Sequence, residues 1–186
     1  MTEQNKHSYD ASDIQVLEGL EPVRLRPGMY IGGTDEKAWH HLPIEIMDNS
    51  IDEAVAGFAK KISVNLIDFK TIEITDDGRG IPVDEHPKYP GKSALEVILT
   101  TLHSGGKFNN NVYKTSGGLH GVGSAVVNAL SSEMIVTIWR DGYEWNQSFS
   151  RGRPTTTMTR GDASRAHGTR IRFTPRDKNA LARAIR

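Results

Sequence analysis

Three side chains that could act together lie one turn apart along one predicted helix. His41, Glu45 and Asn49 are spaced i, i+4 and i+8, and either Asp52 or Glu53 extends the series. Helical geometry places such residues on one face, with neighbours about 6 Å apart. An imidazole, a carboxylate and a carboxamide placed in this way can orient a base, activate a water molecule and bind a hard cation. A solvated helix face has the same composition, so other segments must decide between the two interpretations.

A glycine-rich run precedes the predicted helix at 124–130 and is a candidate phosphate cradle. It reads Gly117-Gly118-Leu119-His120-Gly121-Val122-Gly123. Glycines let backbone N–H groups approach an anion closely, and the N-terminus of the following helix favours negative charge. The run is not the dinucleotide-binding fingerprint, because Val126 occupies the third glycine position. An ordinary turn is the alternative.

A second candidate phosphate ligand, Lys107, belongs to a loop expected at 104–118. Loops of this length in a compact domain are usually lids or binding loops. Gly105-Gly106-Lys107-Phe108 is not a Walker A loop, because the earlier glycine and the final Ser or Thr are missing. A solvated lysine is equally compatible with the sequence.

Two adjacent carboxylates, Asp76 and Asp77, end a predicted strand and begin the turn Gly78-Arg79-Gly80-Ile81-Pro82. One interpretation is turn chemistry, in which Asp caps its own backbone. The other is a buried carboxylate that accepts a hydrogen bond from a ligand amine, such as the exocyclic amino group of adenine. Ile81, Pro82 and Ile98 would then supply apolar walls for a flat base.

Other classes of protein find little support. The chain has no His-Glu-x-x-His zinc pattern and no Gly-x-Ser-x-Gly nucleophile elbow. It has no cysteine, which excludes a disulfide framework and a thiolate metal site. No run of 18 apolar residues and no apolar N-terminal segment occur, so we expect a cytoplasmic protein that does not enter a membrane.

Length and composition favour one globular domain, with residues 1–8 flexible and residues 9–186 folded. The formal net charge of zero hides an uneven distribution, with +8 over residues 151–186 and −8 over residues 1–150. The basic end either contacts nucleic acid or forms a solvated edge.

The hydrophobic periodicity that must position these residues indicates an α+β fold. Ser93-Ala94-Leu95-Glu96 is a capping box, and Asp141-Gly142 marks a hairpin. We expect helices at 14–20, 40–58, 93–103 and 124–130, strands at 61–67, 71–75, 134–140, 143–150, 153–159 and 169–174, and a last helix after 177.

These elements predict a two-layer sandwich, in which a mostly antiparallel mixed sheet carries helices on one face. The helix at 40–58 must turn an apolar stripe toward this sheet. The stripe that we expect to be buried consists of Ile44, Met47, Ile51, Ala54, Val55 and Phe58.

The candidate motifs also follow a familiar order along the chain. Glu45-x-x-x-Asn49, Asp76-x-Gly78-x-Gly80, the run from 117 to 123 and Gly168-Thr169 occur in sequence. This order resembles the ATP-binding superfamily shared by gyrase, the Hsp90 chaperones, histidine kinases and the MutL repair proteins, which has a Bergerat-type fold.

The connecting segments are similar to the ATPase domain of bacterial type IIA topoisomerase B subunits, over about residues 9–175. Within that family, Gly19-Leu20-Glu21-Pro22-Val23-Arg24 and Asp48-Asn49-Ser50 favour the topoisomerase IV branch over the gyrase branch. The similar segments are 26–33, 48–54, 76–82, 103–108 and 113–123.

The resemblance implies roles for the residues already singled out. Glu45 would be the general base for the attacking water, with His41 orienting it, and Asn49 would ligate Mg²⁺ between the phosphates. Asp76 would bind the adenine amino group, with Thr169 beside it through a water molecule. Ile81, Pro82, Ile98 and Ile171 would pack around the base, and Arg79, Gly80 and Tyr113 are further implied ATP contacts. The residues that would hold the phosphates are Lys107 and the backbone of Gly117, Gly118, Leu119, His120, Gly121, Val122 and Gly123.

The resemblance also implies partners. An arm with Tyr9 and Ile14 would reach a second copy when ATP binds, and Arg79 and Arg140 would line the mouth where ATP-site inhibitors bind. The full enzyme would act on DNA together with a topoisomerase A subunit.

Two departures from the family pattern stand beside these implications. Pro43 lies near Glu45 where an ordinary helix former is expected, and the transducer domain with its γ-phosphate lysine does not follow within the 186 residues. The alternatives are an ATP-gated chaperone-like or MutL-like clamp, against which the sequence of 103–123 argues, and a nucleotide sensor without turnover, against which Glu45 argues.

Overall fold

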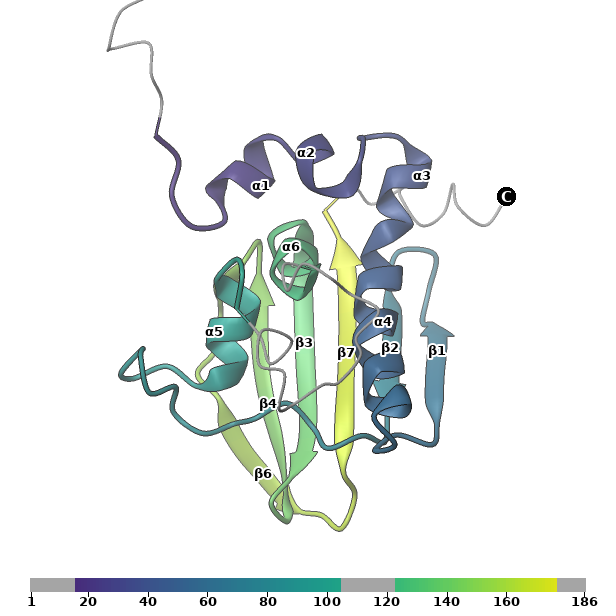
Figure 1. Ribbon diagram of the computed structural model, residues 1–186, viewed down its shortest axis with the longest axis vertical. Coiled ribbons are helices and arrows are strands. Elements are labelled where there is room, and N and C mark those ends of the chain that lie inside the picture. Colours follow the sequence, from purple (N-terminus) through teal and green to yellow (C-terminus); the bar gives the residue numbers. More distant parts are fainter. Residues whose placement is uncertain (1–15, 105–122, 177–186) are drawn as a thin grey trace, which may run out of the picture.

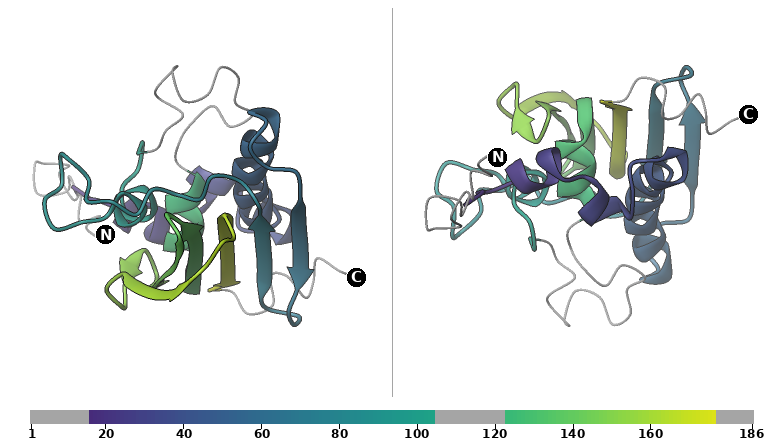
Figure 2. Two further views of the ribbon diagram at one scale, coloured as in Figure 1. Left: turned by 90° about the horizontal axis from the view of Figure 1, so that it is seen from below. Right: turned by 90° about the horizontal axis from the view of Figure 1, so that it is seen from above.

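The computed structural model describes residues 16–104 and 123–176. Within these ranges the chain forms a two-layer α+β sandwich, in which helices cover one face of a seven-stranded sheet (Figures 1 and 2). This arrangement confirms the expected fold class, and every strand pairing within the described ranges is antiparallel. The expected flexible N-terminus at 1–8, the expected arm, the 104–118 loop beyond its first residue and the expected last helix lie outside the described residues.

The sheet has the order β1-β2-β7-β3-β4-β5, and β6 pairs with β4. Both expected hairpins are confirmed. The second one turns at Asp141 and Gly142, whose positive φ angles of 56° and 83° suit the tight turn that right-twisted strands require. The strands are β1 (Ile62–Leu66), β2 (Ile72–Asp76), β3 (Ser131–Arg140), β4 (Tyr143–Ser150), β5 (Arg153–Pro154), β6 (Thr159–Ala163) and β7 (Gly168–Pro175).

The single strand expected at 153–159 was wrong. The chain instead pairs for two residues in β5, leaves the ladder and pairs again in β6. Pro154 has no N–H to continue a ladder, and the backbone N–H groups of Thr155 and Thr156 both donate to the carbonyl of Ser148. These bonds form a local loop between the two short strands.

The helices are α1 (Glu21–Leu25), α2 (Gly28–Ile31), α3 (Glu36–Trp39), α4 (His41–Val55), α5 (Ala94–Thr100) and α6 (Gly123–Ala129). Ser93 caps α5 as predicted, since its Oγ accepts the Glu96 N–H at 3.1 Å. The helix expected at 14–20 was wrong over its described part. Residues 16–20 are irregular, and α1 begins only after them because Pro22 suits a first helical turn.

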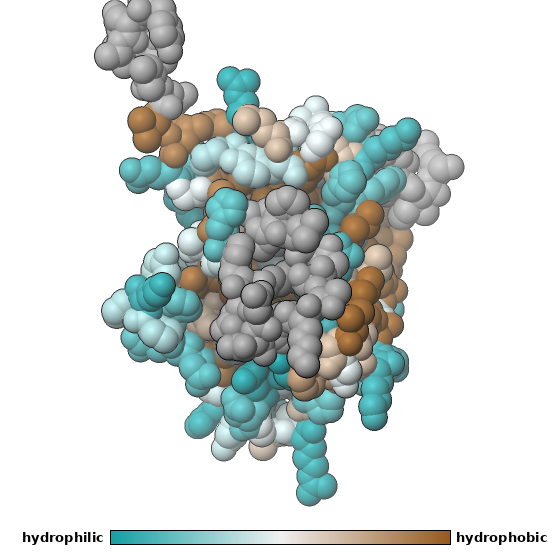
Figure 3. Space-filling model, in the orientation of Figure 1, coloured by the Kyte–Doolittle hydropathy of each residue, from teal (hydrophilic) through white to brown (hydrophobic). Residues whose placement is uncertain are grey.

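The face that α4 turns toward the sheet differs from the predicted one. Leu42 and Ile46 are buried, whereas Ile51 is 39% exposed and Val55 is 63% exposed. The surface in Figure 3 shows the resulting apolar flank beside α4 and β1. Apolar residues occur on two sides of this helix, and periodicity alone does not say which side meets the sheet. The exposed members of the predicted stripe are Ile44, Ile51, Val55 and Phe58.

The core lies between the helix layer and the sheet. Its helical half comes from the buried sides of all six described helices, α1 to α6, and its sheet half from inward-facing residues of β2, β3, β4 and β7. Among the described residues no helix is both long enough and apolar enough to cross a bilayer. The largest fully buried side chains are Phe149, Phe173, Leu42, Ile46, Ile74, Leu95, Leu99, Leu130, Met134, Ile138, Gln147 and Val23.

Candidate active site

The carboxylate of Glu45 lies where α4 approaches the beginning of α6. Glu45, His41 and Gly123 line one cavity of about 250 Å³, together with Val126 and the chain around Tyr30. A Cβ added at Gly123 would overlap the carboxylate of Glu45, so this side chain lies directly against the beginning of α6. The structure therefore brings the acid-bearing helix and the last glycine of the predicted phosphate cradle together.

Asn49 follows one helical turn after Glu45 and also faces α6. Its Nδ2 donates to the Oγ of Ser124 at 2.9 Å, which fixes the orientation of the carboxamide. The Asn49 Oδ1 makes no bond to this hydroxyl and is a hard oxygen ligand of the type that Mg²⁺ accepts. The described residues hold no cluster of three or more His, Asp or Glu suited to a metal ion. A single protein ligand such as Asn49 Oδ1 fits an ion that keeps water and phosphate oxygens as its other ligands.

Asp76 is the buried carboxylate at the end of β2, with 8% of its surface exposed. Its Oδ2 accepts the hydroxyl of Ser50 at 2.8 Å, and its Oδ1 accepts the backbone N–H of Gly78 at 2.9 Å. Burial raises the pKa of Asp76 above its ordinary value of 3.8, and the nearby Glu53 carboxylate acts in the same direction. The bonds from Ser50 and Gly78 oppose this rise but do not cancel it.

Asp77 has the opposite surroundings although it is the next residue. Its Oδ1 accepts the backbone N–H groups of Lys60 at 2.7 Å and Lys61 at 2.8 Å. These two bonds lower the pKa of Asp77 below its ordinary value. Asp77 therefore ties the turn to the chain between α4 and β1, whereas Asp76 makes the local bond to the Gly78 N–H and is the buried carboxylate of the two.

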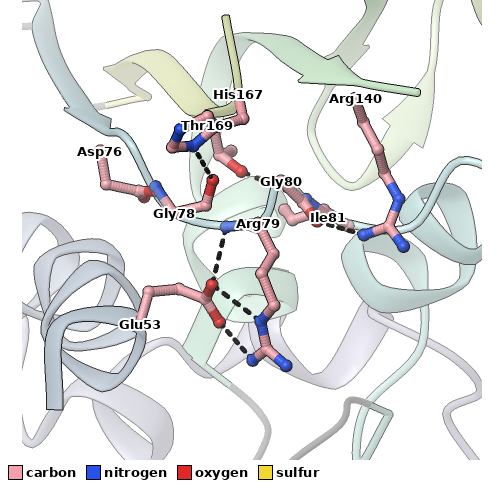
Figure 4. A network of polar contacts seen from close by, with 9 residues as sticks. All are labelled: Glu53, Asp76, Gly78, Arg79, Gly80, Ile81, Arg140, His167 and Thr169. Atoms are coloured by element: carbon pink, nitrogen blue, oxygen red, sulfur yellow. Dashed lines mark hydrogen bonds and ion pairs between the residues drawn. The ribbon is translucent and has the colours of Figure 1, made fainter. Parts of the chain in front are cut away.

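The turn after Asp77 is clamped by side chains from three elements (Figure 4). Glu53 of α4 accepts the backbone N–H of Arg79 at 2.9 Å and pairs with its guanidinium at 2.7 Å. Arg140 of β3 donates to the carbonyl of Gly80 at 2.8 Å. Beside them, the N–H of Ile81 donates to the Oγ1 of Thr169 at 3.2 Å. The backbone of the turn is thus fixed relative to α4, β3 and β7.

A cationic hollow of about 610 Å³ opens beside this turn. Arg79 and Arg140, which were predicted to line the mouth of the site, both line this hollow, together with Arg165 and His167. The Nε of Arg140 lies 3.4 Å from a carboxylate oxygen of Asp141 without forming a hydrogen bond. The hollow therefore has a predominantly positive rim.

The remaining predicted contacts divide into two groups. Ile171 is buried in β7, Ile81 and Ile98 are half-buried, and Pro82 is exposed. Their packing around a base stays a prediction. The residues that lie outside the described ranges are Tyr9, Ile14, Lys107, Tyr113, Gly117, Gly118, Leu119, His120, Gly121 and Val122.

Comparison with known proteins decides the family. The model of the histidine kinase-, DNA gyrase B- and HSP90-like ATPase family matches residues 34–179, which include α4, the Asp76 turn and β7. The chain belongs to this ATPase family. The motif order noted in the sequence and the antiparallel sheet with helices on one face agree with that membership.

Individual relatives place the chain more narrowly. The B subunit of DNA topoisomerase 4 from Caulobacter vibrioides is 64% identical over 170 residues, which are 91% of this chain and 24% of that protein. The B subunit of DNA gyrase from Thermotoga maritima is 53% identical over 167 residues, 90% of this chain and 26% of that protein. This chain thus spans about a quarter of the length of the curated relatives that it matches.

A solved structure agrees with the fold. The 43K ATPase domain of Thermus thermophilus gyrase B, in complex with an aminocoumarin, superposes with a TM-score of 0.73 and 44% sequence identity. The match covers 84% of this chain and 38% of that one.

Sequence reasoning missed two side chains of the site and left a third open. Ser50, which donates to Asp76, follows Leu42 and Ile46 at i+4 on the buried side of α4. A hydroxyl at this position of an otherwise apolar series could have indicated a buried polar contact. Glu53 was left as an alternative to Asp52, and the structure assigns the contact with Arg79 to Glu53. His167 had no signal, because its contact with Gly78 joins residues far apart in the sequence.

Proposed function

We propose that this chain binds ATP between α4, α6 and the joined ends of β2 and β7, and that it supplies the ATPase activity of a cytoplasmic bacterial type II topoisomerase. The observation that carries the proposal is the buried Asp76 carboxylate, which burial and a raised pKa make expensive for a fold to retain without a ligand. The membership in an ATPase family and the similarity to the B subunit of a topoisomerase 4 support the same function.

The adenine end of the site would depend on Asp76 and Thr169. These two residues are directly paired in the β2–β7 register, and both are 8% exposed. The Asp76 carboxylate would accept the adenine amino group, and Thr169 would reach the ring through a water molecule. A hydrogen bond to a carboxylate in a dry site is both strong and selective for a base that can donate.

The phosphate end would lie toward Glu45, Asn49 and Gly123. Glu45 would take the proton of the attacking water while His41 orients it, and Lys107 with the backbone of 117–123 would hold the phosphates. Mg²⁺, held by Asn49 and phosphate oxygens, would neutralise negative charge that develops on the phosphates. The task of the protein is then to position the water and provide its base.

The larger assembly is part of the same proposal. A topoisomerase A subunit and DNA would be the partners of the full-length enzyme, ATP binding would join two copies through the Tyr9 and Ile14 arm, and inhibitors would occupy the mouth at Arg79 and Arg140. The test is DNA relaxation or decatenation by a full-length B subunit that carries this domain, mixed with its A subunit. Strand passage that proceeds equally well without ATP, or none at all, would reject the topoisomerase assignment.

Nucleotide selectivity tests the site in the chain itself. We expect ATP and ADP to raise the melting temperature of the 186-residue chain and GTP to have little effect, because guanine carries a carbonyl where adenine has its amino group. A shift of equal size with GTP would show that Asp76 does not select the base.

Replacing Asp76 by asparagine should weaken ADP binding by about 1.5–3 kcal/mol, the usual loss for a charge-assisted hydrogen bond. Asparagine keeps the shape and the acceptor for the Gly78 N–H but lacks the charge. Isothermal calorimetry with ADP measures the effect, and unchanged affinity would remove Asp76 from the site.

The stability of the same variant separates binding from folding. Because the pKa of Asp76 is higher in the folded chain than in the unfolded chain, the folded state binds this proton more tightly. The contribution to stability is therefore fully present below pH 3.8 and is lost as pH rises through the raised folded value. Asparagine does not titrate, so the ligand-free variant should melt at pH 7 at the wild-type temperature or above it. A lower melting temperature would make Asp76 a structural residue.

A further inference from the structure

One peptide group in the Asp76 turn is held at both of its polar ends. The N–H of Arg79 donates to Glu53 Oε2 at 2.9 Å, and the carbonyl of Gly78, in the same peptide group, bonds the Nδ1 of His167 at 2.8 Å. Figure 4 shows the two contacts reaching the turn from opposite sides. A peptide group held in this way cannot rotate without breaking one of the two bonds.

The tautomer of His167 follows from its partner. A carbonyl oxygen can only accept a hydrogen bond, so the Nδ1 of His167 must carry the hydrogen. The neutral ring then has its other nitrogen, Nε2, free of hydrogen. His167 is placed for this contact because the next residue, Gly168, packs directly against the carbonyl of Asp76.

The held peptide group is directly coupled to the carboxylate of Asp76. The N–H of Gly78, one bond before the Gly78 Cα, donates to Asp76 Oδ1 at 2.9 Å. This N–H belongs to the preceding peptide group, which shares the Gly78 Cα with the held one, so a loss of the His167 contact that displaces this Cα also displaces the N–H from the carboxylate. The orientation of the Asp76 carboxylate therefore depends on the contact between His167 and Gly78.

We infer that His167 is a positioning residue of the nucleotide site, which fixes the Gly78–Arg79 peptide group and through it the carboxylate that receives the adenine amino group. The inference rests on the proposed ATP function. The proposed role depends on the Nδ1–H donor of His167 and not on the volume of its ring. Substitutions that have the same shape but differ in donors can therefore test it.

Three substitutions of His167 separate these properties. His167→Asn places an amide N–H near the position of Nδ1, His167→Asp has the same shape but offers only acceptors, and His167→Ala removes the contact. We expect ADP binding by the 186-residue chain, measured by calorimetry, to stay within about twofold for asparagine and to weaken about fivefold for alanine. Aspartate should weaken it further, because two acceptors would face each other.

Amide NMR signals of the ligand-free chain give a second readout that does not depend on nucleotide. The Arg79 and Gly78 amides should shift in His167→Asp and His167→Ala and remain near the wild-type positions in His167→Asn. A general loss of folding would instead displace signals across the whole sheet, including the beginning of β3 at residues 131–135, which pairs with the end of β7 remote from Gly168.

The possible results separate this inference from the proposed function. Equal ADP affinity for the asparagine and aspartate variants would overturn the positioning role while leaving the ATP site in place. Shifted Arg79 and Gly78 amides with unchanged ADP affinity would do the same. No ADP binding by the unaltered chain would overturn the proposed function and the inference together.

Discussion

Replacing Glu45 by glutamine is expected to lower ATP turnover about 10²–10⁴-fold and to leave ATP binding nearly unchanged. Glu45 lines the cavity between α4 and α6 with His41 and Gly123, at the phosphate end of the proposed site. Glutamine has almost the same size and still accepts a hydrogen bond from water. It cannot take up a proton, so the attacking water loses its base while the nucleotide keeps its contacts.

Turnover should be measured by steady-state ATP hydrolysis in a full-length B subunit that carries this domain, with calorimetry of ATP binding alongside. Asp48→Asn is the matched control, because it removes a half-buried carboxylate from the same helix three residues further along. We expect the control to change turnover by less than about twofold, as for substitutions away from special contacts. Normal hydrolysis by the Glu45→Gln variant would show that another group is the base.

Replacing Gly168 by alanine is expected to abolish measurable ADP binding and to lower the free energy of unfolding by about 2–4 kcal/mol. Gly168 has a φ of 129°, which side chains rarely adopt. A Cβ there would lie 2.9 Å from the Asp77 Cα and would overlap the carbonyl oxygen of Asp76. Because these are backbone atoms, β2 and β7 would have to separate where Asp76 and Thr169 are paired.

Gly142→Ala separates the effect of the backbone angle from that of the overlap. Gly142 also has a positive φ, of 83°, but a Cβ there would meet no atom within 4 Å. We expect this control to lose only about 1 kcal/mol of stability and to keep full ADP affinity. Chemical denaturation and calorimetry measure both quantities. Equal losses for the two variants would mean that the close approach of β7 to Asp76 is unimportant.

Local patterns predicted most of the secondary structure. The Ser93 cap, the Asp141-Gly142 turn and the alternating strands depend on contacts within a few residues, and all three appear where expected. Two elements were predicted wrongly because a single residue interrupts an otherwise regular pattern. The helix expected at 14–20 and the single strand expected at 153–159 had suitable periodicity, but Gly19 has a left-handed φ of 59° and Pro154 has no N–H to continue a ladder.

The site shows the same division. Motif order alone pointed to an ATPase family, and the family comparison confirms it. The resemblance assigned the adenine contact to Asp76, but the residues alone left both interpretations open, because adjacent carboxylates on a turn have the same local chemistry. Lys60 and Lys61 approach one of them and Ser50 the other only after α4 and β1 have packed beside the turn.

The amino-acid sequence by itself determined the family, the order of the motifs and the elements that carry them, because capping, turn formation and alternation act over short distances along the chain. Only the tertiary structure decided which side of α4 is buried, which of the two aspartates is buried beside Ser50, and that His167 holds the turn at Gly78. These outcomes depend on contacts between segments up to about 90 residues apart. Burial and hydrogen bonding at such separations follow from how the helix layer sits on the sheet, and no pattern within a single segment encodes that placement.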